Sequence, residues 1–322
     1  MSAWSSWFAA PRPTLGLEIS AGGVAAVRLA GSDGTPVIAA AAVEPLPAGA
    51  VVPALNAPNV ADRGALTAAL RRVLEGIGGR PRRAALVLPD TVAKISLLRF
   101  EKVPAREHDL LELVRWQVRK SVPFRIEDAQ VSYVAGAQGP HGRDFLVLVA
   151  RRDVIAEYES ACAAAGTHAG IVDVATCNLV NAVLAARRAP GGDWLLVNLA
   201  PDYVSLAIVR GGDLVFYRHR GAEDDTTLAD VVHQTAMYYE DRLSGGGFAR
   251  VVLAGAARAA AGVGGLESVR RELESRLQTR VETIDALESS LGITRGAGAL
   301  GERLRLDVLA PAVGVVLRER VS

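Results

Sequence analysis

The chain opens with short apolar runs separated by small polar turns, a pattern typical of β-hairpins. The runs Leu15–Ile19, Val24–Leu29 and Val37–Val43 predict three antiparallel strands. The segments Ser20–Gly23 and Gly31–Gly34 lie between them, and their glycines are expected to supply the positive φ that tight hairpin turns need. The pattern therefore predicts a three-stranded meander near the start of the chain.

The same pattern returns in the second part of the chain. Apolar runs separated by small polar turns stand at 195–199, 203–209 and 214–218. An offset of 180 residues aligns the two copies and places Glu18 over Asn198. A repeat of this kind predicts two halves built on one topology.

Helical spacing follows each meander. Apolar residues three and four positions apart predict helices over 65–76, 228–243 and 266–277, and apolar runs predict buried strands at 83–88 and 251–253. Meander, helix, strand and helix, twice over, is the pattern of a duplicated α/β fold with a cleft between its halves.

An additional segment separates the two copies. It predicts a strand over 91–100, a helix over 104–121 and strands at 131–135 and 145–150, which together form a small α+β insert. The chain then returns to a helix at 153–165, a strand at 171–174 and a helix at 176–187, before the Pro- and Gly-containing hinge 189–192.

These elements predict the following domain organisation. We expect a flexible tail at 1–13, the first half at 14–90, the insert at 91–151, a return to the first half at 152–190, the second half at 191–306, and a C-terminal helix over 307–322 that packs back on the first half.

Charge and composition exclude several functional classes. Of the 322 residues, 36 are Lys or Arg and 35 are Asp or Glu, so the chain lacks the global positive charge that attracts nucleic acid. Half of the residues are hydrophobic and the mean hydropathy is +0.22. The longest uncharged run, 45–61, nevertheless contains four prolines and two asparagines, so we expect no transmembrane helix.

Motifs for common catalytic and metal sites are absent from the sequence. None of the three lysines follows a glycine, which excludes a Walker-type phosphate loop, and the five histidines show no H-E-x-x-H spacing. Cys162 and Cys177 have no second pair, so they are expected to be reduced thiols in the core. We therefore predict no catalytic residue and no metal site from these motifs.

Taken together, the repeat and its glycine-bearing first turn resemble the actin, sugar-kinase and Hsp70 superfamily, with its ribonuclease H-like halves. Within it the chain resembles the type IV pilus assembly protein PilM family, relatives of the cell-division protein FtsA. The resemblance extends over about residues 14 to 320. It is carried by the segments 15–24, 85–90, 97–100, 103–104, 113–124, 145–151, 238–239, 251–255 and 310–318, with Tyr133.

This resemblance implies a nucleotide site between two glycine-rich hairpin turns, each led by an acidic residue, with a third turn for the adenosine. The residues at these positions are Glu18, Ser20, Gly22, Gly23, Asn198, Asp202 and Gly255. The second turn departs from the pattern because Asn198 is neutral, Pro201 has no N–H to offer, and Tyr203 is bulky. We expect little hydrolysis, whereas binding of ATP with Mg²⁺ stays open.

The resemblance also implies a partner. The family is thought to hold the extended cytoplasmic N-terminal peptide of a membrane-anchored PilN-like protein in a groove between the insert and the first half. Arg99, Phe100, Trp116 and Phe124 are the candidate groove residues, and at least one of the last two is expected in the core of the insert.

The function expected from the sequence is therefore that of an actin-like scaffold. It would lie in the cytoplasm, at the inner membrane only through its partner, and couple that partner to a cytosolic assembly motor. The alternatives are an active ATPase or small-molecule kinase on the same fold, or the cytoplasmic domain of a type II secretion platform. Self-association stays open, and no nucleic-acid partner is expected.

Overall fold

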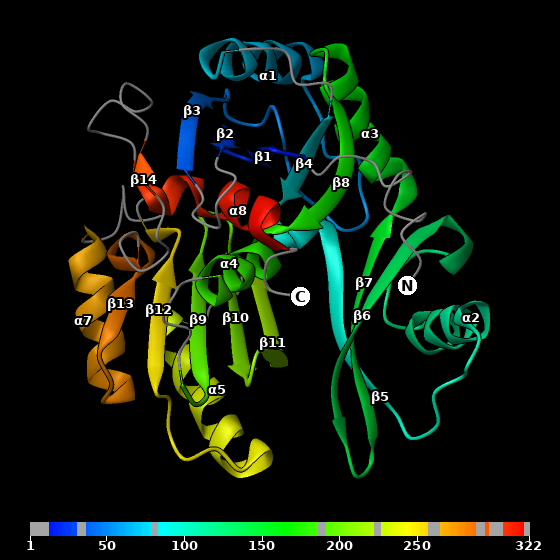
Figure 1. Ribbon diagram of the computed structural model, residues 1–322, viewed down its shortest axis with the longest axis vertical. Coiled ribbons are helices and arrows are strands. Elements are labelled where there is room, and N and C mark those ends of the chain that lie inside the picture. The colour runs from blue at the N-terminus through cyan, green and yellow to red at the C-terminus, as the bar shows by residue number, and fades with distance from the viewer. Residues whose placement is uncertain are drawn as a thin grey trace.

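The computed structural model describes residues 13–30, 37–78, 83–185, 191–221, 227–256, 265–287, 294–295 and 305–318. These form two mixed β-sheets with helices on both faces, and a smaller antiparallel sheet beside them (Figure 1). Residues 1–12 of the predicted tail at 1–13, the turn at 31–34, and residues 189–190 of the hinge at 189–192 lie outside the described residues.

The sheet of the first half has the strand order β14-β3-β2-β1-β4-β8. Its strands are β1 (Leu15–Ser20), β2 (Gly23–Ala30), β3 (Val37–Pro45), β4 (Arg83–Leu88), β8 (His168–Val174) and β14 (Thr294–Arg295). Two helices, α1 (Arg63–Gly76) and α3 (Arg152–Ala164), cover one face and bury a continuous apolar core. Asp62 caps α1 by accepting the N–H of Ala65 at 2.8 Å.

The second half repeats this arrangement with the order β11-β10-β9-β12-β13. Its strands are β9 (Trp194–Leu199), β10 (Tyr203–Arg210), β11 (Asp213–Gly221), β12 (Arg250–Ala254) and β13 (Val281–Thr283), and a 3₁₀ turn, η3 (Ile284–Leu287), follows. The helices α5 (Leu228–Leu243) and α7 (Gly265–Leu277) cover its outer face.

Strand registers repeat at the offset that the sequence predicted. Ile19 pairs with Val24 across the first turn, and Leu199 pairs with Val204 across the equivalent one. In both halves the first strand also pairs in parallel with the strand that follows the meander, β1 with β4 and β9 with β12. The predicted duplication is therefore confirmed strand by strand.

The insert is a three-stranded antiparallel sheet of order β5-β7-β6 with one helix on its outer side (Figure 1). It contains η1 (Asp90–Val92), β5 (Ala93–Phe100), α2 (Glu107–Val118), η2 (Ile126–Asp128), β6 (Ala129–Gly139) and β7 (Gly142–Arg151). The helix is shorter than the predicted 104–121, because Arg106 still has extended backbone dihedral angles. The last two strands are longer than predicted and meet in a tight hairpin at Pro140–His141.

Two helices, α4 (Ala175–Leu184) and α8 (Leu306–Leu317), lie between the two large sheets (Figure 1). They are apolar on nearly all sides, as expected of helices buried in the centre of a protein. A Cβ on Gly16 would lie 1.9 Å from the carbonyl oxygen of Ala312, and one on Gly314 would lie 1.8 Å from that of Asn178. Glycine therefore allows α8 to contact β1 and α4 at backbone distance.

The first hairpin turn corrects one sequence argument. Neither Gly22 nor Gly23 has a positive φ, whereas Gly211 and Gly212 in the β10–β11 turn do. Gly23 is required for a different reason, since a Cβ there would lie 2.6 Å from the carbonyl oxygen of Glu44 on β3. Glycine is therefore required at position 23 because β3 lies too close for a Cβ, and not because of the turn conformation.

Of the two cysteines, Cys162 is buried in the core of the first half, as predicted, while Cys177 is partly exposed. Burial raises the pKa of the Cys162 thiol to about 12, and burial with the nearby carboxylates Asp173 and Asp90 also raises the pKa of Cys177.

A raised thiol pKa leaves little thiolate at pH 8. We expect the native protein to react with a disulfide reagent such as DTNB at least about a hundredfold more slowly than the unfolded protein. Labelling of both cysteines at the unfolded rate would contradict these environments.

None of the described helices combines the length and the apolarity that crossing a lipid bilayer requires.

Candidate functional site

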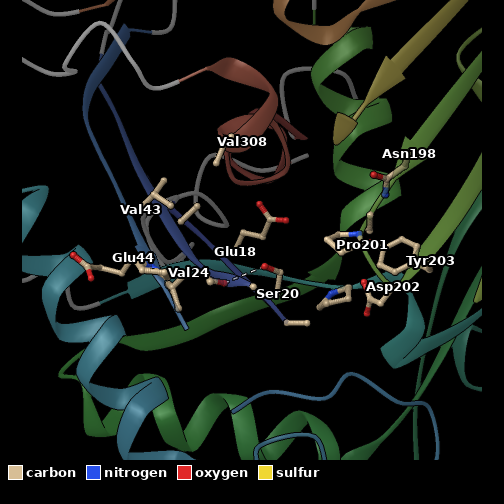
Figure 2. A pocket seen from close by; sticks show the side chains of 17 residues that line it. Glu18, Ser20, Val24, Val43, Glu44, Asn198, Pro201, Asp202, Tyr203 and Val308 are labelled. Carbon is tan, nitrogen blue, oxygen red and sulfur yellow. Dashed lines mark hydrogen bonds between the residues drawn. The ribbon is translucent and has the colours of Figure 1, made fainter. Parts of the chain in front are cut away.

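A cavity of about 300 Å³ lies between the first turns of the two meanders (Figure 2). The β1–β2 turn forms one wall and the β9–β10 turn the other, and Val308 of α8 reaches it from above. We call this cavity the cleft. Six of the seven nucleotide-site residues expected from the sequence line it: Glu18, Ser20, Gly22, Gly23, Asn198 and Asp202.

Glu18 on β1 and Asn198 on β9 occupy equivalent positions in the two large sheets, and both side chains lie at the cleft (Figure 2). Only 4% of Glu18 and 2% of Asn198 is exposed. The Asn198 side chain donates a hydrogen bond from Nδ2 to Oγ1 of Thr176 at 3.0 Å, so its amide is held toward α4. The second acidic position of an actin-like nucleotide site is thus a neutral amide with a protein partner.

The two turns offer few donors to a phosphate. Ser20 donates its hydroxyl to the carbonyl of Gly23 at 3.1 Å, within its own turn (Figure 2). In the second turn the N–H of Ala200 donates to the carbonyl of Tyr203 at 2.9 Å, and Pro201 has no N–H. The residues that line the cleft include the carboxylates Glu18, Glu44 and Asp202, but no lysine, arginine or histidine from the described chain.

Gly255, the seventh residue, does not line the cleft. Its N–H donates to Oδ1 of Asp307 at 2.6 Å, and a Cβ would lie 2.0 Å from the carbonyl oxygen of Leu199. Asp307 in turn donates its own N–H to Oδ1 of Asp285 at 2.8 Å. The N–H of Gly255 is therefore already hydrogen-bonded to the start of α8. The described residues also contain no group of three or more His, Cys, Asp or Glu side chains placed to hold a metal ion.

A second concave region lies between the insert on one side and, on the other, the first half together with the β10–β11 turn of the second half. It consists of two hollows, with volumes of about 370 and 80 Å³, which both include Leu148 and Asp173 in their walls. We call the two together the groove. Its floor is the face of the insert sheet that α2 does not cover, and its opposite wall is formed by α4, β8 and the β10–β11 turn.

Alternation along β7 explains this floor. Phe145, Val147 and Val149 point to α2 and fill the core of the insert, so Leu146 and Leu148 point to the other face and line the groove. Among the described strands β8 pairs with β4 alone, so it is an edge strand of its sheet. The groove thus combines an apolar floor with a sheet edge, the two features by which proteins commonly bind extended peptides.

Acidic side chains surround the groove. Of the described residues, Asp144, Asp173 and Asp213 line it, together with one arginine, Arg318, whose guanidinium lies 3.6 Å from Asp173. Burial raises the pKa of Asp173, and the N–H of Val174 and the charge of Arg318 oppose that shift. The groove therefore suits an occupant that combines apolar and basic side chains.

The four candidate groove residues from the sequence do not come together. Phe100 and Phe124 are partly buried against the core between α2 and the insert sheet, and Phe124 also lines a separate open hollow of about 720 Å³ beside α3. Trp116 is 58% exposed on α2, with the guanidinium of Arg119 5.2 Å from its ring centre. Arg99 reaches the rim of the groove through its ion pair with Asp144, with contacts of 2.6 and 2.8 Å.

Leu146 and Leu148 were missed by the sequence argument. The run 145–149 is apolar throughout, which is the signal of a strand buried on both faces. This run indicates that the second face of the strand is also covered, but it does not indicate which segments of the chain lie opposite that face.

Comparison with known proteins agrees with this fold. The sequence matches the profile of a family described as type IV pilus assembly protein PilM over residues 16–242. The structure is similar to a chain of a PilM-PilN type IV pilus biogenesis complex, with a TM-score of 0.76 and 19% identity, covering 97% of this chain and 99% of that chain. It is also similar to a Bacteroides thetaiotaomicron protein of unknown function with an actin-like ATPase fold, with a TM-score of 0.50, 12% identity and the same coverage. The predicted actin-like fold is confirmed.

Proposed function

Because this chain belongs to the type IV pilus assembly protein PilM family, we propose that it is an actin-like scaffold that binds the cytoplasmic N-terminal segment of a PilN-like membrane protein. The segment lies in the groove between the insert and the first half. The protein thereby stays at the cytoplasmic face of the inner membrane, held there by its partner.

The observation that carries this proposal is that one groove combines an apolar floor with the edge strand β8, which has β4 as its one partner among the described strands. An extended segment adds to β8 as a further strand and forms main-chain hydrogen bonds there. Its apolar side chains bury against Leu146 and Leu148. The partner of the structurally similar chain, a PilN protein, supports the choice of occupant.

Binding is tested with a synthetic peptide that covers the cytoplasmic N-terminal segment of the proposed PilN-like partner. Fluorescence anisotropy of the labelled peptide should rise to saturation as the protein is added. Because the groove is acidic, affinity should fall as salt is added when the peptide carries basic residues. No binding at any salt concentration would contradict the proposal.

We further propose that the cleft does not turn over ATP. The support comes from the second turn. Where the expected nucleotide site would have a carboxylate and a free N–H, this chain has the neutral amide of Asn198, which is bound to Thr176, and Pro201. Phosphoryl transfer relies on Mg²⁺ and preorganised donors around the phosphates, and the cleft contributes no cationic side chain from the described residues.

The expected result with Mg·ATP is phosphate release no faster than in the buffer blank. The Glu18→Gln variant is the matched control, since Glu18 is the carboxylate that remains at the first turn. Measurable turnover in the native protein that disappears in Glu18→Gln would contradict this proposal and favour the ATPase alternative. Isothermal titration with Mg·ATP measures binding separately from turnover.

A further inference from the structure

The groove and the cleft share a wall. Thr176, at the start of α4, is among the residues that line the groove, and Asn198 on β9 is among those that line the cleft. The hydrogen bond between Asn198 Nδ2 and Thr176 Oγ1 therefore joins one site directly to the other.

A third residue fixes this contact. Asp90 follows the cleft residue Pro89, is fully buried, and accepts two hydrogen bonds from Thr176. One comes from the Thr176 N–H at 2.9 Å and the other from its hydroxyl. The hydroxyl thus donates to Asp90 and accepts from Asn198, so neither neighbour can move far without leaving a buried polar group unpaired.

A second connection between the sites passes through packing. The groove wall includes Val180, Asn181 and Leu184 of α4. The backbone of α4 contacts α8 at Gly314 without space for even one methyl group. At its other end α8 carries Val308 into the cleft and holds the Gly255 turn through Asp307. A displacement of α4 must therefore displace α8 or open a tightly packed contact.

We propose that occupation of the groove is coupled to the conformation of the cleft, with Thr176 as the positioning residue between them. The proposal rests on the proposed function, because it takes the groove as the binding site of the PilN-like segment. A segment that packs against α4 shifts Thr176, and Asn198 and the β9–β10 turn follow. Since coupling is reciprocal, whatever stabilises the cleft in that conformation strengthens binding in the groove.

Hydrogen–deuterium exchange with the PilN-like peptide tests the coupling. Direct contact should slow exchange in β8 and in the insert strands that form the groove. The β9–β10 turn, residues 199–203, lies outside the groove walls, and its exchange rate is expected to change by at least about threefold on peptide binding. In Asn198→Ala, which removes the hydrogen bond to Thr176 from the cleft side, the groove should still be protected and the change in the turn lost. Thr176→Ser keeps the hydroxyl and should retain it.

The outcomes separate the two proposals. No protection of the groove overturns the proposed function and the coupling with it. Protection of the groove with an unchanged turn in the native protein overturns the coupling alone. A turn response that persists in Asn198→Ala overturns the role of Thr176. If Asn198→Ala does not fold, Thr176→Val removes the same hydrogen bond from the other side and should give the same loss of the turn response.

Discussion

Replacing Gly314 by alanine is expected to lower the free energy of unfolding by about 2–3 kcal/mol. The added methyl group would lie 1.8 Å from the carbonyl oxygen of Asn178 and 2.6 Å from its carbon, so α4 and α8 must separate. Both helices lie in the core between the two sheets, and the separation would loosen contacts with both halves. Urea unfolding followed by circular dichroism measures the effect.

Gly246→Ala is the matched control, because a Cβ at Gly246 meets no atom within 4 Å and its φ is not positive. It should change stability by less than about 0.5 kcal/mol. If Gly314→Ala were as stable as the control, the close approach of α4 and α8 would be wrong, and the packing route between groove and cleft would be lost with it.

Replacing Leu148 by aspartate is expected to weaken binding of the PilN-like peptide at least about thirtyfold, the loss that corresponds to a contact of about 2 kcal/mol. Leu148 lines both hollows of the groove, and a carboxylate there would be desolvated by the bound segment beside Asp173. Leu148 points away from the core of the insert, so the variant should fold. Anisotropy titration with the labelled peptide measures the loss.

Trp116→Ala separates the two placements of the partner site. Val114 and Val118 of α2 are buried against the insert sheet, and Trp116 stands on the opposite side of the helix, 58% exposed. Because the sheet lies between α2 and the groove, this variant should bind within about threefold of the native protein. Loss of binding in Trp116→Ala with native binding in Leu148→Asp would move the partner site to α2.

Much of the fold could be predicted because the repeat consists of strand and turn patterns that can be recognised within short stretches of the sequence. Strand alternation, turn residues and an offset of 180 gave the two meanders, and the registers Ile19 with Val24 and Leu199 with Val204 agree with them. Helix ends were less predictable. The insert helix was expected to begin at Pro104, but it begins after Arg106, since proline allows a helix start without requiring one.

The candidate site was only partly predictable, because it depends on contacts between distant segments. The family pattern indicated Glu18, Ser20 and Asp202, and these line one cavity. It also indicated Gly255, but sequence spacing does not reveal that Asp307, 52 positions further on, accepts its N–H. The hydrogen bonds of Thr176 with Asp90 and Asn198 span 86 and 22 positions, and no local motif marks them.

The most direct test of the central claim is to find where the PilN-like segment lies on this protein. A peptide that carries a photoreactive group at its apolar positions can be irradiated in the complex and the crosslinked residues identified by mass spectrometry. If the segment binds in the groove, crosslinks are expected at 146–148 on β7 and at 172–174 on β8, the floor and the edge of the groove. Crosslinks confined to α2 around Trp116, or to the cleft, would contradict binding in the groove.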